Sequence, residues 1–210
     1  MLSLLRRLGL GAGADDAPQR WVVVDVETSG LDFEQHGLIS VGALAMRSDG
    51  RVLPADSFET VFRQDVASTK ENILIHGVGV QAQQQGLDPA AATRAFLDFV
   101  GASPIVAFHA PFDRGFLARA VKMFVNQPFN NPWLDLAELA PALEPKAGLK
   151  SLDEWLGHYG IRVSDRHCAA ADAFATALLA ARLLPLARQH GASSFRALQK
   201  LARQAKWLQS

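Results

Sequence analysis

The chain has 210 residues, of which 49% are hydrophobic and 20% charged, and its formal net charge is zero. This length allows one compact domain with at most a small appendage, and the composition excludes a disordered or fibrous protein. The longest apolar runs are short or broken by polar residues, so no membrane span is expected. A lone cysteine, Cys168, excludes an internal disulfide and favours a reducing compartment such as the cytoplasm.

The two ends of the chain differ in character from its middle. The first ten residues carry arginines among leucines without an apolar core or cleavage pattern, so no signal peptide is expected. Gly9–Pro18 is rich in Gly, Ala and Asp, which is typical of a mobile segment. We therefore predict a flexible leader over 1–19, a folded domain over 20–190 and a basic amphipathic helix over 191–210.

The first predicted elements are three strands. Trp21–Val26 is a run of mostly β-branched residues, typical of a strand buried on both faces at the centre of a sheet. Leu38–Met46 and Ser57–Phe62 have the composition of two further strands, separated by the turn sequence Ser48-Asp49-Gly50. These strands are predicted to form an antiparallel meander.

Helices and short strands alternate in the rest of the chain. Asp88 can cap a helix that has Pro89 as its first residue and stops at Gly101. Ser151 and Glu154 form a capping box for a helix through Tyr159. The other predicted elements are a strand at Pro104–Phe108, a helix at Phe112–Phe124, a short strand at Trp133–Leu136 leading into a helix, a helix from Cys168 to about Gln189 that bends or breaks at Pro185, and a helix at Ser194–Leu208. This order predicts an α/β domain with a mixed sheet flanked by helices.

Two carboxylates follow the valine run of the first strand. Asp25 and Glu27 lie two residues apart, so both side chains project from the same face of the strand. Like charges held this close favour a neutralising cation, and hard divalent ions such as Mg²⁺ prefer oxygen ligands. Isolated pairs of this kind more often face water at a strand end, so the pair alone establishes no site.

Two later segments can add side chains to the same place. Asp113 comes shortly after the strand at Pro104–Phe108, where it can either join the acidic pair or cap a helix. His167 and Asp172 lie five residues apart and would point about 140° apart on one continuous helix. They can converge only if His167 precedes the helix, and the small residues at 169–171 would allow that helix to approach the sheet closely. By itself, a single loop histidine is more often a surface residue.

In this order, the segments resemble the DEDDh exonucleases, the DnaQ-like family that includes the epsilon proofreading subunit of DNA polymerase III and ribonuclease T. The resemblance runs from about Arg20 to Leu184. It is carried by Val24–Leu31, His109–Asp113 and His167 with Asp172, and intervening matches occur at Ile75–Val78 and Leu149–Leu152.

The resemblance implies an RNase H-like fold, with a mixed five-stranded sheet in the order 3-2-1-4-5. It also implies 3′-to-5′ removal of nucleotides as 5′-monophosphates with two divalent cations, Mg²⁺ or Mn²⁺. By position, the cation ligands would be Asp25, Glu27, Asp113 and Asp172, and the general base would be His167. The positions that would contact the terminal nucleotide are Thr28, Leu31, His76 and Phe112.

The implied partner is the 3′ end of a single-stranded nucleic acid, DNA rather than RNA, together with a DNA polymerase or another replication or repair protein, and no membrane. Three alternatives stay open. An exoribonuclease would use the same residues on RNA, and a phosphatase acting on small nucleotides would need no groove for a polymer. A catalytically silent binding module of the same fold would be expected to have lost at least one carboxylate, whereas all four are present.

Basic residues gather at the end of the chain. Six lysines and arginines and no acidic residue follow Asp172, whereas the first 172 residues carry 15 basic and 21 acidic side chains. A basic end on an acidic body can steer an anionic polymer towards a cation site. The last predicted helix has an apolar stripe, which either packs against its own domain or docks a partner or a nucleic-acid strand.

Overall fold

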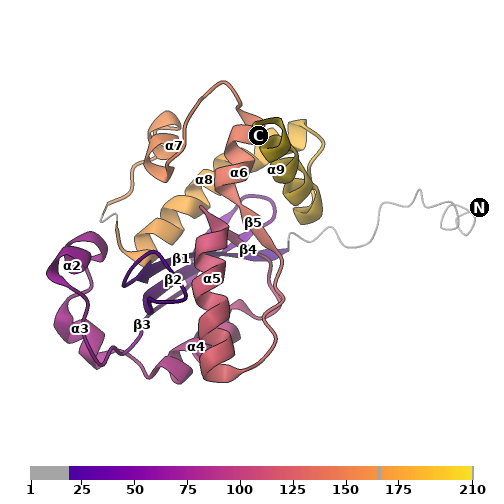
Figure 1. Ribbon diagram of the computed structural model, residues 1–210. Helices are drawn as coiled ribbons and strands as arrows, with labels where there is room; N and C mark the ends of the chain where they lie inside the picture. Colours follow the sequence, from indigo (N-terminus) through magenta and orange to yellow (C-terminus); the bar gives the residue numbers. More distant parts are fainter. Residues whose placement is uncertain (1–18, 165–166, 210) are drawn as a thin grey trace, which may run out of the picture.

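The computed structural model describes residues 19–164 and 167–209. All but the last residue of the predicted leader lies outside the described residues. The described chain forms one mixed sheet between two layers of helices (Figure 1). One face packs against α8 (Ala169–Gln189), and the other packs against α4 (Pro89–Val100) and α5 (Ala110–Ala120).

The sheet has five strands in the order β3-β2-β1-β4-β5, which confirms the implied order. The strands are β1 (Arg20–Thr28), β2 (Leu38–Arg47), β3 (Val52–Val61), β4 (Ile105–Ala107) and β5 (Trp133–Asp135). The pairings β1–β2 and β2–β3 are antiparallel, whereas β1–β4 and β4–β5 are parallel. The predicted meander and the central position of β1 are both confirmed.

Alternate residues of β1 pack into two separate cores. Trp21 and Val23 belong to the core beneath α8, whereas Val22 and Val24 belong to the core beneath α4 and α5. Because side chains alternate along a strand, Asp25 and Glu27 continue the Trp21 and Val23 row. The hydrophobic pattern of β1 thus turns both carboxylates towards the α8 layer.

The remaining helices are α2 (Lys70–His76), α3 (Val80–Gln85), α6 (Leu136–Leu143), α7 (Leu152–His158) and α9 (Phe195–Gln209). The predicted capping box of α7 is present, since the Ser151 hydroxyl accepts the Glu154 amide and the Glu154 carboxylate accepts the Ser151 amide. Helix α9 contacts α6 and β5 and buries Leu198 and Ala202 in the core. Of the two expectations for the last helix, packing against its own domain is therefore confirmed.

Two regions of the chain differ from their predicted structure. β3 begins at Val52, five residues earlier than expected, because a register shift between Leu44 and Ala45 of β2 accommodates the stretch around Pro54. Proline is tolerated there because β3 lies at the edge of the sheet. Helices α2 and α3 were not predicted, since their sequences are polar and short and carry no clear helical periodicity.

Two further helices depart from their predicted boundaries. Helix α5 begins at Ala110, two residues early, and gives way to a π-helical turn at Val121–Val125. Helix α8 runs without interruption through Pro185, so of the predicted bend or break the break is wrong. Leu183, Leu184 and Ala187 around that proline are all buried, and their packing outweighs the cost of about 3 kcal/mol for an interior proline.

Helix α8 also bears on the expectation that no segment is apolar enough to cross a membrane. By length and composition alone its 21 residues are sufficient, because alanines join the shorter apolar runs and an 18-residue stretch of the helix has a mean hydropathy of 1.4. Half of this stretch is buried inside the protein, where it covers the sheet. Core helices of globular domains pass the same test, so a single such helix is weak evidence for a span.

Candidate metal centre

Three carboxylates converge where β1 ends and α8 begins. Asp25 and Glu27 come from β1, and Asp172 comes from the first turn of α8. One oxygen from each side chain lies within 4.8 Å of the others, and all three residues are half-buried. The pairing of the strand acids with Asp172, expected from sequence, is therefore found in the structure.

This convergence depends on a close approach between α8 and β2. Gly42 of β2 pairs with Asp25 of β1, and a Cβ placed on it would lie 2.2 Å from the carbonyl carbon of Ala169. No side chain fits at that distance, so only glycine allows the start of α8 to pack beside Asp25. The role of Gly42 was missed in the sequence analysis, although a glycine inside a strand is itself a sign of close backbone approach.

The protonation of Glu27 reflects this crowding. Burial, and then the charge of Asp172, raises the pKa of the Glu27 carboxyl to about 7. Both causes penalise a negative charge at this position, and a bound divalent cation would reverse the penalty. Three carboxylates within reach of one another are a donor set that suits a hard cation such as Mg²⁺.

Asp113 approaches the acidic group from α5, on the other helical layer. Its side chain is only 3% exposed, and it is not one of the three residues whose oxygens lie together. Burial raises the pKa of Asp113 well above its ordinary value, and the charges of Asp135 and Glu27 add to this effect. The alternative role as a helix cap is wrong, because the N-cap of α5 is His109.

His167 lies in the segment before α8, as its convergence with Asp172 requires. The helix starts at Ala169 with Cys168 as its N-cap, and His167 adopts a left-handed backbone conformation with φ 70°. Its amide donates a hydrogen bond of 3.3 Å to Oδ1 of Asp172. The backbone of His167 is therefore hydrogen-bonded to one of the three clustered carboxylates, while the residue itself is exposed.

The four residues expected at the terminal nucleotide occupy different environments. Leu31 is 85% exposed, whereas the Thr28 hydroxyl is buried and donates to the carbonyl oxygen of Gly30. Phe112 is half-buried, with its ring centroid 5.0 Å from that of Phe116. His76 is 1% exposed. Leu31 and Phe112 thus retain surface for a ligand, and the other two side chains serve the protein's own structure.

His76 belongs to a buried polar network that holds α2 against the end of β1. Its Nδ1 accepts the Val78 amide at 2.9 Å, so Nε2 carries the proton and donates to Oδ1 of Asn72 at 3.0 Å. The Asn72 amide donates in turn to the carbonyl oxygen of Thr28 at 3.2 Å. Burial lowers the pKa of His76, which favours this neutral state. Asn72 was missed because nothing in its sequence context predicted a helix.

Asp135 is a second residue that sequence analysis missed. It caps α6 by accepting the Ala137 amide at 2.9 Å, and the same oxygen accepts the His109 amide at 3.0 Å. His109 has a left-handed φ of 65° at the start of α5. Asp135 therefore fixes the turn that precedes Asp113. Its position between a strand and a helix was a signal for capping, but not for the bond to His109.

Comparison with known proteins gives a family for this arrangement. The exonuclease family model (RNase_T) matches residues 22–180. A DNA polymerase III subunit epsilon-like protein of Rhodobacter capsulatus is 32% identical over 181 residues, which cover 85% of this chain and 25% of that protein. A PolC-type DNA polymerase III of Clostridium perfringens is 32% identical over 162 residues, covering 75% of this chain and 11% of the polymerase. The chain thus spans a quarter or less of these relatives.

Solved structures share the fold at lower sequence identity. Escherichia coli exonuclease I in complex with a dT13 oligonucleotide has a TM-score of 0.71 and 20% identity, covering 82% of this chain and 42% of that one. Exonuclease X in complex with 5′ overhanging duplex DNA has a TM-score of 0.67 and 19% identity, covering 87% and 99%. The fold is the RNase H-like exonuclease fold, and with the family match over residues 22–180 the chain belongs to the exonuclease family, in its DnaQ-like group.

Proposed function

We propose that this protein is a 3′-to-5′ exonuclease that hydrolyses terminal phosphodiesters of single-stranded nucleic acid, DNA in preference to RNA, and releases nucleoside 5′-monophosphates. The observation that carries this proposal is the convergence of Asp25, Glu27 and Asp172 within 4.8 Å, on a chain that belongs to the exonuclease family. Three acids held this close at the edge of a core are costly without a cation. Their retention fits a catalytic domain better than a silent binding module.

Each acidic residue has a proposed part in this chemistry. Asp25, Glu27 and Asp172 would hold divalent cations, Mg²⁺ or Mn²⁺, and Asp113 would contribute to a second ion from the α5 side. Cations bound here would polarise the scissile phosphate, lower the pKa of the attacking water and stabilise the departing 3′ oxygen. The carboxylates orient the phosphate by fixing the positions of these charges.

His167 is the proposed general base. The imidazole would accept the proton of the attacking water. The hydrogen bond from the His167 backbone amide to Asp172 keeps His167 next to the acidic group, and the His167 side chain is exposed. At the terminal nucleotide, Leu31 and Phe112 would contact the base or sugar directly, and His76 and Thr28 would position the surrounding segments.

The proposal is tested by digestion of a 5′-labelled single strand with Mg²⁺, read at single-nucleotide resolution. Asp25→Asn removes one ligand charge with little change in volume and should lower the rate roughly a thousandfold. Asp98→Asn, an exposed acid on α4, is the matched control and should digest at the wild-type rate. Equal product ladders from Asp25→Asn and wild type would contradict the proposal.

The preference for DNA is tested with matched DNA and RNA oligomers in parallel. It draws support from the nucleic acids in the similar structures, a dT13 oligonucleotide with exonuclease I and a 5′ overhanging duplex DNA with exonuclease X. We expect faster digestion of DNA, and a faster rate on RNA would make the protein an exoribonuclease. The polymerase relatives lead us to propose a DNA polymerase or another replication or repair protein as the partner.

A further inference from the structure

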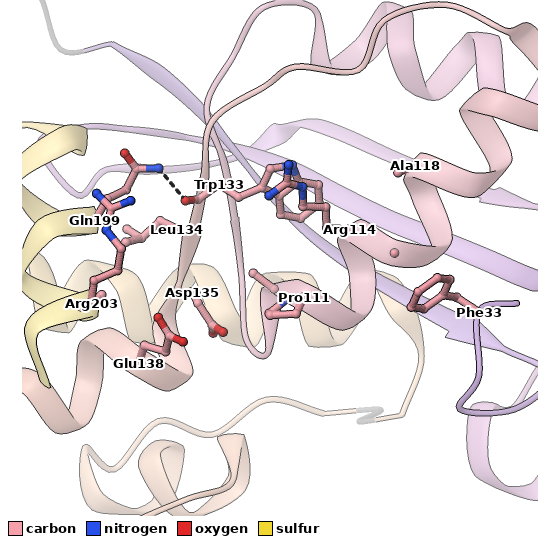
Figure 2. Close-up of a pocket in the computed structure, with 13 residues that line it drawn as sticks. Phe33, Pro111, Arg114, Ala118, Trp133, Leu134, Asp135, Glu138, Gln199 and Arg203 are labelled. Atoms are coloured by element: carbon pink, nitrogen blue, oxygen red, sulfur yellow. Dashed lines mark hydrogen bonds between the residues drawn. The ribbon is translucent and has the colours of Figure 1, made fainter. Parts of the chain in front are cut away.

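A cavity of about 450 Å³ lies between α5, β5, α6 and α9, outside the group of clustered carboxylates. Figure 2 shows Pro111 and Arg114 on α5, Trp133 on β5, and Gln199 and Arg203 on α9 around it. The volume falls in the range of small-ligand sites. Nothing in the proposed catalytic chemistry uses the cavity.

The cavity adjoins the metal centre through α5. Pro111 lines the cavity, and Asp113 two residues later faces the opposite way, into the core beside Glu27. Asp135 lines the cavity as well, and its charge acts on Asp113. One turn of helix therefore separates the cavity from the acidic group, so a polymer whose end lies at the metal centre could continue into it.

Two arginines and two acids line this cavity, and the arginines are the groups available to an anion. Arg114 comes from α5 and Arg203 from α9, on either side of β5 (Figure 2). Both residues are exposed, and among the side chains that the structure describes, which end at Gln204, neither guanidinium has an ion-pair or hydrogen-bond partner. The two acids are Asp135, one oxygen of which accepts two backbone amides, and Glu138, which has an interaction of its own; neither carboxylate is ion-paired with either guanidinium. Unpaired guanidinium groups on two elements are suited to phosphates.

The cavity also offers aromatic surface. Phe33, which is 43% exposed, lies directly over Gly115 of α5, where an added Cβ would come 2.8 Å from its ring. Trp133 contributes a second ring, and the Gln199 side chain fixes its strand by donating to the Trp133 carbonyl oxygen at 2.8 Å. Aromatic rings beside cationic side chains are a usual means of holding single-stranded nucleic acid without regard to sequence.

We propose that this cavity binds the nucleic-acid strand upstream of the scissile phosphodiester, with Arg114 and Arg203 on its phosphates and Phe33 beneath a base. The inference rests on the proposed exonuclease activity and assigns a second binding region to it. An apolar protein surface is less well matched to the cavity, because it would desolvate the two guanidinium groups and leave them without a partner. Helix α9 then has two roles, packing with its apolar side and binding substrate through Arg203.

The test compares long and short substrates in the full-length protein. The variant Arg114→Ala/Arg203→Ala is assayed on a single strand of about twelve nucleotides and on an aryl ester of a nucleoside 5′-monophosphate, which has no nucleotide upstream of the scissile bond. We expect the KM for the long strand to rise about tenfold relative to the KM for the aryl ester, with kcat for the long strand little changed. The control is Arg94→Ala/Arg196→Ala, which removes two exposed arginines on α4 and α9 that do not line the cavity.

The salt dependence of binding is a second readout. With Ca²⁺ replacing Mg²⁺, the slope of log affinity against log salt for the long strand should become less steep by about 1.4, since each lost phosphate contact on a single strand contributes about 0.7. A long-to-short KM ratio and a salt slope equal to those of wild type would overturn the inference and leave the cavity to a protein partner. Failure of the wild-type protein to digest either substrate would instead contradict the proposed function.

Discussion

Glu27 is the residue at which stability and function conflict most directly. A carboxyl whose pKa in the folded protein is about 7, against an ordinary 4.5, holds its proton more tightly in the folded state than in the unfolded state. Its contribution to stability is therefore fully present below pH 4.5 and is lost as the pH rises to about 7. Binding a cation here requires a negative charge on Glu27, whereas burial and Asp172 disfavour that charge in the cation-free protein.

Glu27→Gln should raise the melting temperature of the chelator-treated protein at pH values well above 7, because the neutral amide removes a charge that burial and Asp172 oppose. Well below pH 4.5, where the wild-type carboxyl is also neutral, the two proteins should melt alike. Thermal denaturation across this range makes the comparison, with the exposed Glu34→Gln as control. Parallel curves for wild type and Glu27→Gln would show that the charge carries no such penalty.

His167→Ala should lower the rate of strand digestion by roughly a hundredfold or more without changing the melting temperature, because an exposed general base does not support the fold. His190→Ala, at another exposed histidine, should behave as wild type. An unchanged rate for His167→Ala would remove this residue from the mechanism.

Among the elements, α8 brings the site together because β2 has no side chain where the helix begins. Gly42→Ala would place a methyl group 2.2 Å from the Ala169 backbone, so the helix must move away from Asp25. We expect a loss of about 2 kcal/mol or more in the free energy of unfolding, together with weaker cation binding. Chemical denaturation and cation titration measure the two effects.

The matched control for that variant is Gly157→Ala in α7. No atom lies within 4 Å of an added Cβ at this position, so alanine should be neutral or stabilise the helix by up to about 1 kcal/mol. A Gly42→Ala protein with wild-type stability and cation affinity would show that α8 does not need the close approach.

The elements that sequence alone predicted are those with strong local patterns. The valine run of β1, the Asp88–Pro89 start of α4 and the capping box of α7 all match the structure. Helices α2 and α3 depend instead on contacts between residues distant in sequence, such as the hydrogen bond from the Asn72 side chain to the Thr28 carbonyl oxygen. No local sequence pattern predicts such a contact. The acidic group was predictable from strand alternation and family resemblance, but the support from Gly42 and Asp135 appears only when the elements are packed together.

At the scale of the whole molecule, α9 joins the end of the chain to its first strand. Phe195 stacks edge-on against Trp21 with ring centroids 5.0 Å apart, and Leu198 is fully buried. We therefore propose that 191–210, although distinct in charge, unfolds together with 20–190 rather than as a separate unit.

Leu198→Ala should accordingly cost about 2–5 kcal/mol of stability for the whole domain. Helical circular dichroism and tryptophan fluorescence should report a single coincident transition at the lower midpoint. Leu87→Ala, at a leucine that is 52% exposed, should shift it far less. An early loss of helical signal with the fluorescence transition unchanged would show that α9 unfolds independently.

The three clustered acids of the candidate metal centre are carried by two elements that fill the domain interior, the central strand β1 and the core helix α8. An ion held between them can bind only while strand and helix remain docked, so its binding energy adds to the resistance of the entire fold to heat. We expect the melting temperature to climb steadily with the logarithm of Mg²⁺ or Mn²⁺ concentration above the dissociation constant, and calorimetry with chelator and with ion measures it. A melting temperature that neither ion changes would mean that the acids do not bind the ion in the folded protein. A rise would allow thermal-shift measurements to rank the metals before any nucleic acid is added.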